Sequence, residues 1–325
     1  MYFRPLGSTG ILISELGFGT WGIGHGMWGK TDDQESIHAL QTAINAGVNF
    51  IDTALIYGDD LNHHSEKLIG QCLKSLPKER KVYVATKIYP LNSQWPALPH
   101  IPIEEVFPKE WIYEAVETSL RNLGVQSIDL MQFHVWQDSF AEDQEWQDAV
   151  RDLTKQGKVK HWGISVNDYE PTNCVETLQT GLISTIQFIF NIFHQKPIQE
   201  LLPFAKEHNI GLIARVPLDE GGLTGTMTPT TQLTDWRKYY FRDQRLIQLQ
   251  QRVEAIRTRM PAEIETMTEL ALRWVISHPE VSTVIPGMRT QKHVLENVKA
   301  IEKGILPPHL MKELSKHAWE RNFYW

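Results

Sequence analysis

The sequence predicts an α/β fold, namely a closed (β/α)8 barrel of the TIM type. Three observations lead to this prediction: eight short apolar, strand-like segments are present, helix-like segments separate them, and the first strand lacks a strong dinucleotide fingerprint. Strands that alternate with helices form a parallel sheet with right-handed crossovers. A barrel and a doubly wound open sheet both satisfy that rule, so the glycine pattern and the strand count have to decide.

The eight expected strands are short runs rich in β-branched and aromatic residues. They are Leu16–Gly19, Val48–Asp52, Val82–Lys87, Ile128–His134, Trp162–Ser165, Thr185–Phe190, Gly211–Arg215 and Thr283–Pro286. Helical periodicity is clearest in Lys109–Leu123, where Ile112, Ala115, Val116, Leu120 and Leu123 share one face. The other expected helices are Asp32–Asn45, His64–Leu73, Trp146–Gln156, Pro171–Gln179, Pro197–His208, a region within Asp243–Ser277, and Thr290–Ile301. Thr31 is expected to cap the first helix, with Gln34 at the capping-box position.

The glycines after the first strand favour the barrel. Gly22, Gly24 and Gly26 form G-x-G-x-G without the continuation of a dinucleotide fingerprint, and the helix begins several residues later. We therefore expect one barrel domain over residues 1–325. A β-hairpin turning at Ser8-Thr9-Gly10 should cap its bottom, and long loops should lie at the carboxyl face of the strands. Those loops are Tyr89–Pro108, Trp136–Glu145 and Pro217–Tyr240.

Composition excludes several classes of protein. The net charge is -7, which gives no basic surface for nucleic acid. Two cysteines far apart argue against a disulfide scaffold and fit a reducing compartment. The N-terminal segment has no apolar run typical of a signal peptide, and no stretch is apolar enough for a membrane helix. We expect a cytoplasmic protein with no nucleic-acid or membrane partner.

Polar residues end several of the predicted strands. Asp52, Lys87, His134, Ser165 and Arg215 stand at strand ends, and Gln187 lies within the sixth strand. In a (β/α)8 barrel these ends converge on one mouth. Taken singly, each has a bland explanation, such as a turn cap, a solvated strand end or a satisfied histidine. An acid, a base and the phenol of Tyr57 on successive strand exits are more readily explained by a proton-transfer site.

This set suits proton donation to a carbonyl oxygen. A free tyrosine is a poor acid near neutrality, and an adjacent ammonium such as Lys87 is expected to lower its pKa. Asp52 would keep Lys87 protonated and oriented, and a neutral N–H of His134 would orient the carbonyl. None of these groups is an electron source, so a reduction needs a cofactor.

With these residues in place, the chain resembles the aldo-keto reductase superfamily along essentially its whole length. The matching segments include Leu6–Gly10, Leu16–Trp21, Asp52 with Tyr57, Thr86-Lys87, Ile128–His134, Gly157–Lys160, Gly163–Ser165, Leu223–Gly225, Ile285–Gly287 and Glu296-Asn297. The resemblance implies that Asp52, Tyr57, Lys87 and His134 are a catalytic tetrad. It also implies NADPH or NADP as the cofactor, favoured over NADH, bound without a Rossmann fold.

The resemblance further implies a cofactor path across the barrel mouth. Ser165, Asn167 and Gln187 would meet the carboxamide, with Thr20, Trp21 and Asp52 at the same end. Leu218, Gly222 and Leu223 would follow the pyrophosphate, and Arg289, Glu296 and Asn297 would lie at the adenosine. Arg289 would favour a 2′-phosphate, because guanidinium groups suit phosphate oxygens. The alternative is that Arg289 is a solvated residue at the start of a helix and does not contact the cofactor.

Two positions depart from the family pattern. Arg215 stands where relatives often carry a tyrosine that stacks on the nicotinamide, although some relatives share the arginine. The usual Ser-Asn pair after the fifth strand is Ser165-Val166-Asn167 here, which puts the role of Asn167 in doubt.

The expected activity is reduction of aldehydes or ketones, with Tyr57 as proton donor. Tryptophans on the predicted loops predict an aromatic-walled pocket for apolar or aromatic carbonyls: Trp21, Trp28, Trp95, Trp136 and Trp236. The alternatives are a redox-sensing subunit resembling the β-subunits of potassium channels, and a lyase or aldolase using Lys87 as a Schiff base. His63-His64 has no accompanying carboxylate–histidine pattern, so no metal site is predicted.

Overall fold

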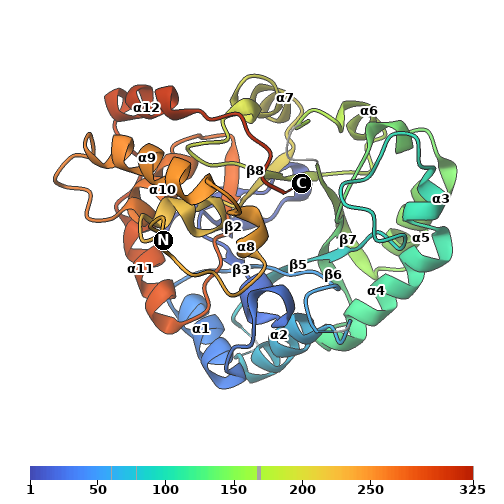
Figure 1. Ribbon diagram of the computed structural model, residues 1–325. Coiled ribbons are helices and arrows are strands. Elements are labelled where there is room, and N and C mark those ends of the chain that lie inside the picture. The colour runs from blue at the N-terminus through green and yellow to red at the C-terminus, as the bar shows by residue number, and fades with distance from the viewer. Residues whose placement is uncertain (60, 78, 167–169, 325) are drawn as a thin grey trace.

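In the computed structural model, which describes residues 1–59, 61–77, 79–166 and 170–324, eight parallel strands form one curled sheet with helices around it (Figure 1). The strands follow one another in chain order from β3 to β10. They are β3 Phe18–Gly19, β4 Phe50–Asp52, β5 Tyr83–Ile88, β6 Ile128–Phe133, β7 Val159–Ser165, β8 Thr185–Ile189, β9 Gly211–Arg215 and β10 Val281–Val284.

The first and last strands meet, and this closes the sheet. The Gly17 N–H donates to the Val284 carbonyl over 2.9 Å, and the Gly19 N–H to the Pro286 carbonyl over 3.0 Å. A doubly wound sheet would reverse its strand order and keep two open edges. Consecutive order together with closure confirms the (β/α)8 barrel and excludes the doubly wound alternative.

The helices match most of the expected segments. They are α1 Asp33–Asn45, α2 His64–Ser75, α3 Ile103–Val106, α4 Lys109–Leu123, α5 Gln144–Lys155, α6 Val175–Gln179, α7 Leu201–Glu207, α8 Arg237–Tyr240, α9 Arg245–Arg257, α10 Met267–Ile276, α11 Gln291–Glu302 and α12 Pro308–Leu314. The expected cap at Thr31 is wrong by one residue. Asp32 caps α1, its carboxylate accepting from the Glu35 N–H over 2.8 Å. Helix α12, which begins at Pro308 after the last expected helix, was not predicted from the sequence.

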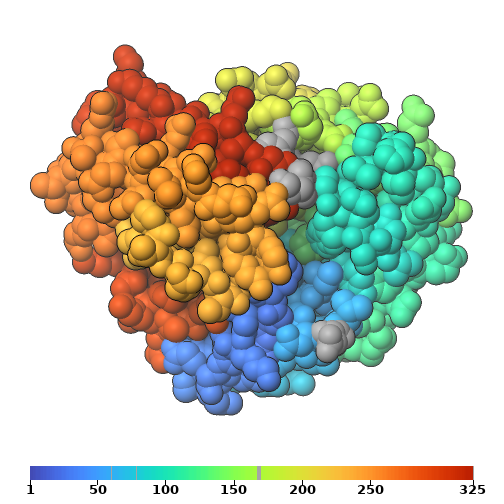
Figure 2. Space-filling model, viewed as in Figure 1, coloured from blue at the N-terminus to red at the C-terminus, as the bar shows by residue number. Residues whose placement is uncertain are grey.

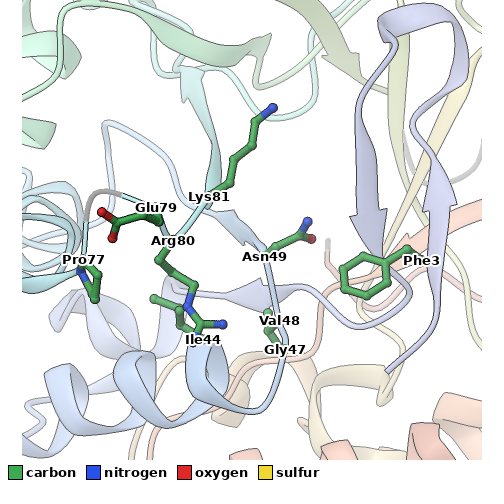
Figure 3. A pocket seen from close by; sticks show the side chains of 9 residues that line it. All are labelled: Phe3, Ile44, Gly47, Val48, Asn49, Pro77, Glu79, Arg80 and Lys81. Carbon is green, nitrogen blue, oxygen red and sulfur yellow. The ribbon is translucent and has the colours of Figure 1, made fainter.

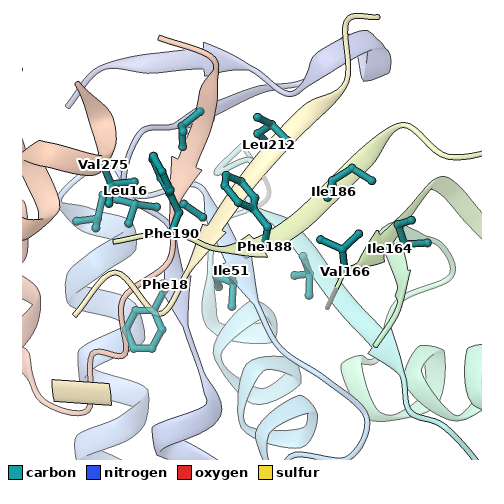
Figure 4. Close-up of a cluster of buried hydrophobic side chains, with 14 of the residues drawn as sticks. Leu16, Phe18, Ile51, Ile164, Val166, Ile186, Phe188, Phe190, Leu212 and Val275 are labelled. Carbon is teal, nitrogen blue, oxygen red and sulfur yellow. The ribbon is translucent and has the colours of Figure 1, made fainter. Parts of the chain in front are cut away.

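Side chains that alternate along each strand create two separate apolar layers. The outward side chains pack under the helices, among them Ile51, Ile164, Ile186, Phe188 and Leu212 (Figure 4). The residues between them point into the barrel, where the smaller cluster contains Phe50, Ala85, Leu130 and Ile213. This two-residue period therefore decides which strand-end side chains enter the barrel.

The N-terminal hairpin plugs the bottom of the barrel, as predicted. Its strands are β1 Phe3–Pro5 and β2 Leu12–Ser14, and its Leu6, Ile11 and Ile13 join the inner apolar cluster. Gly7 lies directly against the start of β9, and a Cβ on Gly7 would stand 2.2 Å from the backbone nitrogen of Gly211. Only glycine allows so close an approach, so the bottom is sealed and the polar groups face the other end.

Candidate functional site

Polar side chains gather inside the barrel at the carboxyl ends of the strands. Alternation from the inward residues Phe50, Ala85 and Leu130 places the side chains two and four residues later on the inner face as well. These are Asp52 on β4, Lys87 on β5, and Gln132 and His134 at the end of β6. Figure 2 shows this face of the molecule hollowed between the connection after β9, in gold, and the connection after β5, in cyan.

A buried ion pair forms the floor of this site. Nζ of Lys87 donates to Oδ2 of Asp52 and to the Thr53 carbonyl, both over 2.6 Å. The other carboxylate oxygen accepts from the amide of Gln187 over 2.7 Å and from that of Gln132 over 3.4 Å. Lys87 is fully buried and Asp52 nearly so. A pair with its remaining lone pairs satisfied in this way holds both side chains in one geometry.

Tyr57 and His134 lie above the ion pair. Nζ of Lys87 is 5.2 Å from the centre of the Tyr57 ring, and the Tyr57 and His134 rings meet edge to face at 5.8 Å. Trp21 stacks on Tyr57 at 6.0 Å, and Trp95 stands edge-on to His134 at 4.8 Å. The four residues proposed as a tetrad are therefore brought together, with an indole beside each of the two rings.

The phenol of Tyr57 is held in its neutral form. Burial raises the pKa of Tyr57, the Asp52 carboxylate raises it further, and Arg215 opposes both. The expectation that Lys87 would lower this pKa is wrong. The physical reason is that burial of the phenol, together with the Asp52 carboxylate, outweighs the effect of the nearby cations. Burial also lowers the pKa of Lys87, against the effect of Asp52.

His134 is neutral in the folded protein, which predicts a loss of stability in acid. Burial, followed by the charges of Lys87 and Arg215, holds the pKa of His134 well below its ordinary value. The unfolded chain therefore binds one more proton as the pH falls through about 6.5. Between pH 7 and pH 5, the free energy of unfolding should therefore fall by up to about 2 kcal/mol less in His134→Gln than in the unsubstituted protein. Urea unfolding at the two pH values measures this.

The matched control for that experiment is His293→Gln, because His293 is exposed on α11. It should lose stability in acid as the unsubstituted protein does. Equal acid losses for His134→Gln and the unsubstituted protein would contradict the neutral form of His134.

The residues expected to contact a cofactor fall into two groups. Ser165 ends β7 and pairs in register with Gln187 in the middle of β8, both are buried, and Arg215 ends β9. Thr20 is buried too, but its hydroxyl donates to the Asp52 carbonyl over 2.9 Å. Asn167 lies outside the described residues.

The second group follows the connection after β9 and the start of α11. Leu218 precedes the 3-10 turn Asp219–Thr224, which contains Gly222 and the fully buried Leu223. Arg289 lies just before α11, with its side chain along the backbone of Gly22. Of the α11 residues, Asn297 is buried and Glu296 is exposed and faces Lys292 at 3.8 Å.

Sequence reasoning missed Gln132. The alternation Leu130, Gln132, His134 along β6 places its amide inside the barrel, and that period-two pattern would have identified it. Oε1 of Gln132 and Nδ1 of His134 are buried and have no hydrogen-bond partner among the described residues. Partnerless buried polar atoms are costly, so a ligand with polar groups suits this site.

The predicted aromatic walls are partly correct. Trp21, Trp28 and Trp236 form one cluster with ring centres 5.2 to 5.9 Å apart, and Trp95 meets His134 edge to face. Trp136 was misplaced: it is fully buried and packs on Phe133 and Trp146 under the helices. The cluster is closed by Tyr324 of the C-terminal segment, stacked on Trp236 at 6.1 Å.

A second hollow lies at the opposite end of the barrel. It has a volume of about 510 Å³ and is lined by residues that precede the strands, including Asn49 before β4 and Lys81 before β5 (Figure 3). Phe3 of the hairpin forms another wall. Asp52 and Lys87 lie at the other ends of these same strands, so this hollow does not contain the tetrad.

The profile of the Aldo/keto reductase family matches residues 15–318. The chain belongs to this family. It is similar to the NADH-specific methylglyoxal reductase of Escherichia coli, with 30% identity, 96% of this chain and 98% of that protein covered. It is also similar to a probable voltage-gated potassium channel subunit beta of Arabidopsis thaliana, with 27% identity, 93% of this chain and 92% of that protein covered.

A solved structure agrees with this membership. The holo form of an aldo-keto reductase from Bacillus halodurans superposes with a TM-score of 0.76 and 26% identity, with 98% of this chain and 96% of that chain covered. Family members are oxidoreductases that use a nicotinamide cofactor on small carbonyl compounds. Among the described residues, none of the helices combines the length and the apolar character needed to cross a lipid bilayer.

Proposed function

We propose that this protein reduces aldehydes or ketones to alcohols, with hydride from NADPH and a proton from Tyr57. The observation that supports this most strongly is the protonated Tyr57 phenol, whose ring lies edge to face with His134 and beside the Lys87–Asp52 pair. When bound, the reduced nicotinamide supplies a hydride to the carbonyl carbon. NADPH consumption with a panel of carbonyl compounds tests the proposal, and no turnover with any of them would overturn it.

The positions of Tyr57, Lys87 and His134 suggest how the proton is transferred. Tyr57 donates its hydroxyl proton to the carbonyl oxygen as charge develops there. The buried ammonium of Lys87 stabilises the resulting phenolate, and Asp52 keeps that ammonium in place. His134, neutral because burial lowers its pKa, orients the carbonyl by a hydrogen bond without competing as an acid.

The residues present fit a nicotinamide dinucleotide. At one end Ser165 and Gln187, paired in register on neighbouring strands, offer a hydroxyl and an amide. At the other end Arg289 stands at the N-terminus of α11, and helix N-termini together with guanidinium groups suit phosphate. We propose that Trp21, Asp52, Arg215, Leu218, Gly222, Leu223, Glu296 and Asn297 complete this site, with Thr20 holding Asp52. Trp21, Trp95 and Trp236 favour apolar or aromatic substrates.

Arg289 is expected to decide between NADPH and NADH. Its guanidinium would pair with a 2′-phosphate, and a hydrogen bond to a charged group contributes about 1.5 to 3 kcal/mol. We therefore expect Arg289→Ala to raise KM for NADPH by about 10- to 100-fold and to change KM for NADH little. Steady-state kinetics with each cofactor measures this.

Lys292→Ala is the matched control, because Lys292 is an exposed cation on the same helix. It should leave both KM values unchanged. An equal loss with both cofactors in Arg289→Ala, or no loss with either, would assign Arg289 a merely structural role. In that case NADH, the cofactor for which the Escherichia coli relative is specific, would be the expected cofactor.

The alternative function is a cofactor-binding, redox-sensing subunit like the potassium channel β-subunits, and the Arabidopsis relative supports it. It predicts cofactor binding without multiple turnover of any carbonyl in the panel. A Schiff-base lyase is opposed by the geometry of Lys87, whose fully buried Nζ is engaged by two acceptors at 2.6 Å. That amine is not accessible to a substrate carbonyl.

A further inference from the structure

Two histidines and an aspartate from three separate segments meet beside the barrel mouth. His25 lies in the connection after β3, Asp33 begins α1, and His64 begins α2. Nε2 of His64 is 2.8 Å from Oδ1 of Asp33, and Nε2 of His25 is 3.1 Å from the same oxygen. The two imidazole rings lie 4.1 Å apart at 31°. In the sequence, His63-His64 had no accompanying carboxylate–histidine pattern. The structure supplies Asp33, which lies 31 residues before His64.

We propose that His25, Asp33 and His64 bind one divalent transition-metal ion of the zinc class. Zinc lies about 2.0 to 2.2 Å from nitrogen and oxygen ligands, so ligand atoms around a tetrahedral ion stand roughly 3.3 Å apart. The observed separations of 2.8 and 3.1 Å need only a small expansion to admit the ion. Imidazole nitrogen together with a single carboxylate suits zinc, copper or nickel better than the oxygen-seeking magnesium or calcium.

The surroundings support ligation by His25 in particular. Its other ring nitrogen, Nδ1, faces Oδ2 of Asp59 at 3.8 Å, and ligating histidines commonly turn their second nitrogen to a carboxylate. The Thr31 carbonyl oxygen lies 3.1 Å from Nε2 of His25 and offers a fourth ligand. Asp33 and Asp59 are partly exposed, at 44% and 42%, so the ion can enter from solvent. The N-termini of α1 and α2 weakly oppose a cation there, and Asp33 offsets them.

The site is adjacent to the segment that carries Tyr57. A Cβ on Gly24 would lie 3.1 Å from Cβ of Tyr57, and the Gly26 N–H donates to Asp59 over 2.7 Å. Trp21 and Trp28 flank this connection. Binding of an ion by His25 should therefore also change the fluorescence emission of these tryptophans.

The experiment uses the full chain, stripped with EDTA, desalted and titrated calorimetrically with zinc sulfate. Cobalt chloride, followed by visible absorption, detects ligation independently of any enzyme activity. Tryptophan emission detects a change around the connection that carries His25, Trp21 and Trp28. We expect one ion per chain. Removing a ligand should weaken binding at least about tenfold in His64→Ala and in His25→Asn. Asparagine is chosen for position 25, where φ is 66°, because it belongs with histidine to the few residue types enriched at positive φ. His293→Ala should bind as the unsubstituted chain does.

Asp33→Asn provides a variant with an almost unchanged shape if His64→Ala fails to fold, and it should also bind at least about tenfold more weakly. Binding equal to that of the unsubstituted chain in the ligand variants would overturn the proposal. So would the absence of both heat and cobalt absorption. In that event, the three residues form only a hydrogen-bonded cluster.

Discussion

Replacing Tyr57 by phenylalanine should lower kcat by about 10²- to 10⁴-fold, the contribution of a positioned general acid. The substitution removes only the hydroxyl. The ring keeps its contacts with Trp21 at 6.0 Å and His134 at 5.8 Å, so the pocket shape is preserved. Initial rates of NADPH oxidation with the best carbonyl of the panel measure the effect, and quenching of tryptophan emission should show cofactor affinity unchanged.

Tyr89→Phe is the control for this prediction, because Tyr89 follows β5 and packs on Trp111 at 4.8 Å, away from the tetrad. It should retain near-full activity. Burial and Asp52 raise the pKa of Tyr57, so its ionisation should not reduce the rate below about pH 10. If Tyr57→Phe kept most of the activity, another group would have to donate the proton.

Lys87→Met should abolish measurable reduction and also destabilise the fold by about 3 to 5 kcal/mol, because it leaves the Asp52 carboxylate buried without its cation. Asp52→Asn should destabilise in the same way by leaving a buried ammonium. The double variant removes both charges and should recover most of the lost stability. Its activity should remain lost, since no ammonium is left beside Tyr57. Urea unfolding and single-turnover rates together measure both effects.

This cycle separates a structural from a chemical role for the ion pair. The 2.6 Å contact between two buried groups predicts strong coupling of the two single substitutions. Additive losses of stability in the double variant would show that the pair is not energetically coupled. Recovery of activity together with stability would show that Lys87 acts only on the fold.

Alternation along the strands predicts from local sequence which strand-end side chains enter the barrel. Phe50-Ile51-Asp52 is a buried strand that ends in a carboxylate, and its alternation predicts that Phe50 and Asp52 share a face. The same reasoning applies to Lys87 and His134, and all three enter the barrel. Gln132 was missed, although alternation along β6 marks it. The cap at Asp32 was missed by one residue because Thr31 and Asp32 are both good cap residues.

Other features depended on long-range contacts that no local pattern contains. Trp136 was predicted to lie at the mouth because it follows a strand, but it turns outward onto Phe133 and Trp146. Lys87 was expected to acidify Tyr57. Instead, burial raises the pKa of Tyr57, and so does the Asp52 carboxylate, which the packing of β4 against β5 places beside Lys87. The cluster of His25, Asp33 and His64 joins three segments and has no signature in any one of them.

The sequence by itself determined the barrel, the order of its strands and which side chains face inward, because a two-residue period and alternating helices are local properties of the chain. Strand-end positions predicted Asp52, Lys87 and His134 as site residues, and the family resemblance grouped them with the nearby Tyr57 in the proposed tetrad. Only the tertiary structure decided how these groups act on one another. Barrel closure and side-chain packing set the distances and burial, and those quantities control the pKa of Tyr57, the pairing of Lys87 and the meeting of His25 with Asp33.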